Sequence, residues 1–105
     1  MLFHEILFKI RSCADEFSIL STKTTKSKLL YEIGIQLSIL KFEFEQLDYD
    51  KSKKLIERLS ILLNLLDEND DLVIFTKDVL NNVNRYMDKP KITVQEKFNK
   101  LFNCN

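Results

Sequence analysis

The acidic stretch DENDDLVIFTKD carries carboxylates at the spacing at which calcium loops hold their metal ligands. Asp67, Asn69 and Asp71 fall at positions 1, 3 and 5 of such a loop. Position 6 requires a glycine for the sharp turn and holds Leu72, and position 12 requires a bidentate glutamate and holds Asp78. The stretch is therefore interpreted as an acidic connection between two helices, and we expect no metal site.

Nucleophiles and bases are scarce in this sequence and far apart. His4 is the only histidine, Cys13 lies more than two helical turns further along, and Cys104 lies near the end of the chain, so no zinc ligand set is assembled. Paired carboxylates such as Glu43 and Glu45 are two residues apart and do not face each other on a helix. We predict no catalytic residue, no cofactor and no enzymatic activity.

The basic residues do not indicate a nucleic-acid or phosphate site. Lys23, Lys26 and Lys28 stand in a polar segment without the glycine-rich backbone that cradles phosphate. The chain has 16 Lys plus Arg and 16 Asp plus Glu, whereas nucleic-acid binders usually carry a basic excess that neutralises phosphates. A nucleic-acid-binding regulator is kept only as the second alternative function.

Composition favours one helical domain over residues 1–105. Apolar residues make up 45% of the chain, which is enough for one core, while one Gly and one Pro argue against a turn-rich β fold. No run reaches the roughly 18 apolar residues of a membrane-spanning helix, and charges interrupt the N-terminal apolar stretch where a signal peptide would be continuous. We therefore expect a cytoplasmic protein with free thiols and no membrane partner.

The stretch YEIGIQLSILKFEFEQ, residues 31–46, has apolar residues at both strand and helix periods. As a strand it would be far longer than the usual five or six residues, and its phase slips at Ile39 and Leu40. As a helix it keeps one phase and carries two apolar stripes on opposite sides. The first stripe contains Leu30, Ile33, Leu37, Leu40, Phe44 and Leu47, and the second contains Tyr31, Ile35, Ile39 and Phe42.

The remaining chain predicts further helices joined by short polar connections. Apolar residues recur at helical spacing over residues 2–20, after 52 and after 71. We expect Ser27, Asp48 or Asp50, and Asp71 to cap the second, third and fourth helices, and a capping box at residues 93–96 to open a short last helix. The prediction is an all-α fold: an up-down antiparallel bundle of four helices plus a short C-terminal fifth helix.

A small neutral bundle without catalytic groups most often acts by binding another protein, and two features favour this function. The second apolar stripe has to be covered by something. Acidic residues also gather at two connections, where they would steer a cationic partner. The predicted partner-binding residues are Tyr31, Ile35, Ile39 and Phe42 of the stripe, Glu43, Glu45, Asp48 and Asp50 of one connection, and Asp67, Glu68, Asp70 and Asp71 of the other.

In length and helical plan, the chain resembles small bacterial immunity proteins, which neutralise a cognate toxin. The resemblance concerns architecture and rests on no sequence motif, and the neutral charge departs from the strongly acidic members that block nucleases. The resemblance implies a stoichiometric inhibitor whose partner is a cationic toxin or effector. A homodimeric structural or chaperone-like subunit is the first alternative.

The apolar residues Val94, Phe98, Leu101 and Phe102 form a strip that matches the second stripe in kind. We expect this C-terminal segment to cover the stripe, because large apolar side chains left in water promote aggregation. If it docks elsewhere, the stripe becomes the interface of a dimer or of a complex with another protein.

Overall fold

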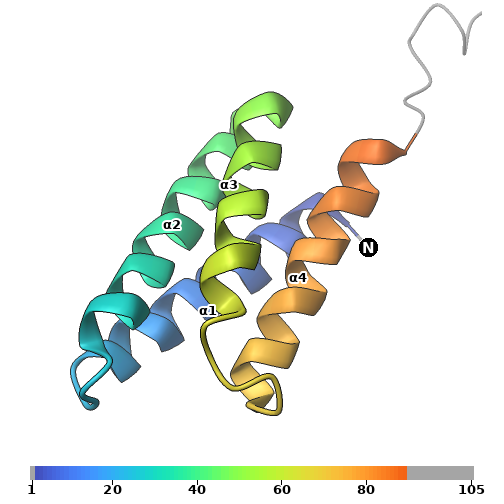
Figure 1. Ribbon diagram of the computed structural model, residues 1–105. Helices are drawn as coiled ribbons and strands as arrows, with labels where there is room; N and C mark the ends of the chain where they lie inside the picture. Colours follow the sequence, from blue (N-terminus) through green and yellow to red (C-terminus); the bar gives the residue numbers. More distant parts are fainter. Residues whose placement is uncertain (1, 90–105) are drawn as a thin grey trace, which may run out of the picture.

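The computed structural model describes residues 2–89, which form four helices and no β-strand. They are α1 (Phe3–Ser21), α2 (Ser27–Glu45), α3 (Tyr49–Leu63) and α4 (Asp71–Asp88). Figure 1 shows the helices running up and down in turn, with α1 next to α2 and α4, and α3 next to α2 and α4. The predicted all-α bundle is confirmed for these residues, whereas the predicted fifth helix lies outside them.

One core fills the space between the four helices, and it is built from the apolar faces that helical spacing predicts. In α1 the buried row runs from Ile6 to Phe17, and in α2 the first stripe is buried from Leu30 to Phe44. Fully buried side chains include Ile10, Phe17, Ile33, Leu37, Leu40, Phe44, Leu59, Leu63, Val79 and Val83.

An aromatic cluster closes the end of the bundle at which α1 begins and α4 ends. The ring of Phe3 lies 5.0 Å from that of Phe44 and 5.5 Å from that of Tyr86, measured between centroids. Tyr49 stacks on Phe44 at 6.2 Å. Residues from all four helices therefore meet here, and the cluster holds the start of α1 and the end of α4 beside the α2–α3 connection.

The helix caps agree only in part with the predictions. Asp48 caps α3, since its Oδ1 accepts a hydrogen bond from the backbone N–H of Lys51 at 3.1 Å. The cap of α4 is Asp70, one residue before the predicted Asp71. The prediction for Ser27 is wrong, because α2 already includes it and the N-cap position holds Lys26, which makes no side-chain cap bond.

Leu47 does not belong to the buried stripe of α2, and that prediction is also wrong. Its φ of 62° is left-handed, and its side chain is 58% exposed. The backbone N–H of Asp48 donates to Glu43 O and that of Leu47 donates to Phe44 O, which is the Schellman pattern that ends helices. The helix thus ends at Glu45, two residues before Leu47 could continue the stripe.

Gly34 allows α1 and α2 to approach closely. A Cβ at this position would lie 3.1 Å from Ser18 Oγ and 3.4 Å from the backbone oxygen of Ala14, both in α1. The single glycine of the chain therefore has a packing role inside a helix, where it would otherwise cost about 1 kcal/mol relative to alanine.

Candidate interaction surface

The second apolar stripe of α2 points away from the core. Tyr31 is 56% exposed, Ile39 40% and Phe42 59%, whereas Ile33, Leu37 and Leu40 on the inner side are completely buried. Ile35, between Tyr31 and Ile39, is half-buried. We call these four residues, Tyr31, Ile35, Ile39 and Phe42, the α2 stripe. Figure 1 shows α2 at the edge of the bundle, with α1 and α3 as its neighbours.

Within residues 2–89, no other helix covers the α2 stripe. α1 packs on one flank of α2, at Gly34, and α3 packs beside it, which leaves the side opposite the core to solvent. The C-terminal segment that we expected to cover the stripe, with Val94, Phe98, Leu101 and Phe102, lies outside the described residues.

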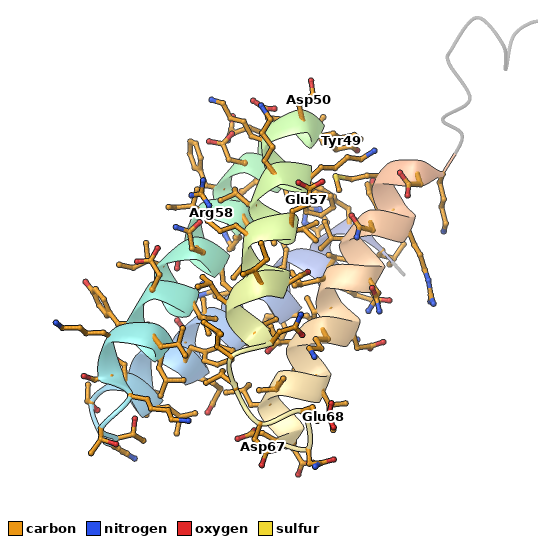
Figure 2. The ribbon with its side chains drawn as sticks, in the orientation of Figure 1. Tyr49, Asp50, Glu57, Arg58, Asp67 and Glu68 are labelled. Atoms are coloured by element: carbon orange, nitrogen blue, oxygen red, sulfur yellow. The ribbon has the colours of Figure 1, made fainter. Side chains whose placement is uncertain are left out.

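The two acidic connections lie at opposite ends of the bundle. Figure 2 shows Asp50 at one end of α3, with Asp67 and Glu68 beyond the other end. The predicted partner-binding carboxylates therefore do not form a single site. Only the first group, Glu43, Glu45, Asp48 and Asp50, is at the same end as Phe42 of the α2 stripe.

Much of the first acidic group is engaged within the protein. Glu45 lies 3.3 Å from Lys41 Nζ, and Asp48 lies 3.9 Å from Lys51 Nζ besides capping α3. Within residues 2–89, Glu43 and Asp50 have no ion-pair partner. The group thus offers a weaker negative potential to a partner than its four carboxylates suggest.

The second acidic group builds the α3–α4 connection. Asp67 Oδ1 accepts a hydrogen bond from the backbone N–H of Asn69 at 3.0 Å, and Asp70 Oδ1 accepts one from that of Leu72 at 2.9 Å. Because α4 begins at Asp71, the last positions of the calcium-loop pattern are helical. No group of three or more potential metal ligands is found within residues 2–89.

A cavity of about 300 Å³ lies between the α1–α2 and α3–α4 connections. No sequence pattern predicted this cavity, because it forms where two connections far apart in the chain meet. Its lining includes Lys26 from the first connection and Asp67 and Asp70 from the second. Its apolar walls are formed by Phe17, Leu20, Leu30, Leu66, Leu72 and Val73.

Cys13 is a core residue and not a nucleophile. Its side chain is completely buried, and it is a free thiol, as predicted. Burial raises the pKa of this thiol above its ordinary value, a hydrogen bond with Thr76 lowers it, and the charge of Glu16 raises it further. The thiolate form is therefore disfavoured near neutral pH. The predicted free thiol at Cys104 lies outside the described residues.

Gln36 is a buried polar residue that the sequence pattern did not single out. Its side chain is 7% exposed, and its Nε2 donates a hydrogen bond to Glu32 Oε1 at 2.9 Å. Its Oε1 has no hydrogen-bond partner within the described part of the chain.

Comparison with family models, with curated proteins and with solved structures finds no match for this chain. No helix within residues 2–89 combines the length and the apolar character needed to cross a membrane.

Proposed function

We propose that this chain is a non-catalytic protein-binding module that forms a stoichiometric complex through the α2 stripe. The observation that carries the proposal is the exposure of Tyr31, Ile39 and Phe42 in one row on a single helix face. Single exposed apolar residues are common on protein surfaces, but a contiguous row of large ones is typical of an interaction site.

The α2 stripe supports binding better than the acidic groups do. Asp48 and Asp70 are helix caps, Asp67 holds a turn, and Glu45 has its own lysine, so these carboxylates already have structural partners. Within residues 2–89, the side chains of the α2 stripe make no such cap, turn or ion pair. Burying them in a complex would contribute about 25 cal/mol per Å² of apolar surface.

Inhibition of a toxin, as in immunity proteins, is one form of this function. In that form, Glu43 and Asp50 at the end of the bundle that holds Phe42 would favour a cationic partner, because neither carboxylate has an ion-pair partner within residues 2–89. Their charge would mainly accelerate association, while the apolar stripe would supply the affinity.

Photo-crosslinking in the cells that produce the chain tests the proposal. A photoreactive phenylalanine analogue replaces Phe42 in one variant and Tyr31 in another. The matched control carries the analogue at Phe8 on α1, which is 70% exposed and lies outside the stripe. We expect one protein to be crosslinked from both stripe positions and none from Phe8. Equal yields from all three positions, or no product from the stripe, would contradict the proposed function.

A further inference from the structure

We propose that the occupant of the α2 stripe is the α2 stripe of a second copy of this chain, with the two helices antiparallel. This inference rests on the proposed function and names the partner. It follows from the order of side chains along α2, from the position of its charges, and from the length of the exposed row.

The apolar residues of the α2 stripe are arranged so that the stripe complements itself. Aromatic residues, Tyr31 and Phe42, stand at its two ends, and two isoleucines lie between them. A two-fold axis crossing the helices near residue 37 places Tyr31 of each copy opposite Phe42 of the other. The same axis places Ile35 opposite Ile39. A two-fold interface requires this reciprocity. If one residue of the first copy contacts a given residue of the second, then the same two positions also meet with the copies exchanged.

The charges beside the stripe select the antiparallel orientation. Lys28 precedes Tyr31 by one turn, and Glu43 directly follows Phe42. At 100° per residue, the side chains of Lys28 and Glu43 lie on the same side of the α2 stripe. The two-fold axis described above brings this side of one copy next to the same side of the other copy. Lys28 of each copy is therefore brought towards Glu43 of the other. In a parallel pair, Lys28 of each copy would instead lie level with Lys28 of the other and about 22 Å along the helix axis from Glu43, so the two opposite charges could not meet.

Neither Lys28 nor Glu43 has an ion-pair partner among the residues that the structure describes. Lys28 is exposed and Glu43 is half-buried. This distinguishes Glu43 from Glu45, whose carboxylate lies 3.3 Å from Lys41 Nζ. Symmetry makes the contact between Lys28 and Glu43 occur twice in each dimer.

The size of the stripe sets the expected affinity. From Tyr31 to Phe42 the helix extends about 17 Å, at 1.5 Å per residue. Two such rows bury an area at or below the roughly 1,200 Å² at which stable interfaces begin. We therefore expect a reversible dimer with a dissociation constant on the order of micromolar.

Sedimentation velocity on the full chain, over roughly 1 to 500 µM and centred on the expected constant, tests the inference. Wild type should pass from the monomer mass of 12.5 kDa to twice that value as concentration rises. Ile39→Asp should remain monomeric throughout, and Phe8→Asp, at a site 70% exposed outside the stripe, should dimerise like wild type. Circular dichroism checks that both variants keep the helical fold.

Charge exchange tests the orientation. Lys28→Glu and Glu43→Lys should each weaken the dimer about tenfold, because each creates two like-charge contacts. The double variant should regain wild-type affinity within about threefold. A wild type that stays monomeric, a dimer unaffected by Ile39→Asp, or a double variant no tighter than the single ones would overturn the inference.

The two experiments together separate this inference from the proposed function. If the chain is monomeric and Phe42 crosslinks to a different protein, the proposed function stands and the second-copy inference is wrong. If Phe42 crosslinks to nothing and Ile39→Asp leaves an observed dimer intact, both are wrong.

Discussion

The two sides of α2 have nearly the same composition and opposite environments. On the inner side, Ile33, Leu37 and Leu40 are completely buried, and on the outer side Tyr31 and Phe42 are more than half exposed. Side-chain chemistry alone therefore does not decide which stripe becomes core. The inner stripe is buried because it meets the apolar faces of α1 and α3, and its Phe44 also meets Tyr86 of α4. No helix within residues 2–89 covers the outer stripe.

The largest expected effect comes from truncating equivalent residues on the two sides. Leu37→Ala should lower the free energy of unfolding by about 3 kcal/mol, because it leaves a cavity in a closely packed core. Ile39→Ala should lower it by less than about 1 kcal/mol, because the side chain is already 40% exposed. Urea unfolding at about 1 µM protein, at or below the expected dissociation constant, measures both in the monomer. Equal losses would contradict the division of α2 into a core side and an exposed side.

A smaller effect is expected where α2 meets α1. Gly34→Leu should cost about 2 kcal/mol, because the added atoms would enter the space held by Ser18 and the backbone of Ala14. Gly34→Ala should change stability by less than about 1 kcal/mol, since the gain in helix propensity offsets a contact that the Ser18 side chain can relieve. Thermal unfolding of both variants checks this. A well-tolerated leucine would show that the flank of α2 at Gly34 is open.

The smallest expected effect lies at the end of α2. Leu47→Gly should raise the free energy of unfolding by about 0.5–1 kcal/mol, because glycine adopts the left-handed φ of 62° without the cost imposed by a Cβ. Leu47→Ala is the matched control and should leave stability nearly unchanged, since it keeps the Cβ. If glycine instead lowers stability, then packing of the Leu47 side chain outweighs the backbone strain.

Local sequence patterns predicted the helices well and their ends less well. The period of Leu30, Ile33 and Leu37 identified α2 as a helix in spite of the competing alternation. The exact caps were harder to assign, because neighbouring Asp70 and Asp71 have the same side chain and only the backbone geometry selects Asp70. Leu47 was misassigned for a related reason, since spacing continues past the residue at which the helix ends.

The exposed α2 stripe was predicted from the sequence only as a set of residues. Periodicity identified Tyr31, Ile35, Ile39 and Phe42 as a second stripe, but it could not show that the stripe is exposed. Exposure depends on where the neighbouring helices pack, and Gly34 directs α1 to one flank of α2. The cavity between the two connections was not predicted at all, because its walls come from positions as distant as Phe17 and Val73.

The sequence by itself determined that this protein is helical, that its charge is balanced, and that α2 is apolar on two sides, because helical period and composition are local properties. Only the tertiary structure decided that no helix within residues 2–89 covers the second stripe of α2, that α1 approaches α2 at Gly34, and that a cavity forms between the two connections. These outcomes depend on contacts between segments distant in the chain, and such contacts have no signature in the spacing of residues along it.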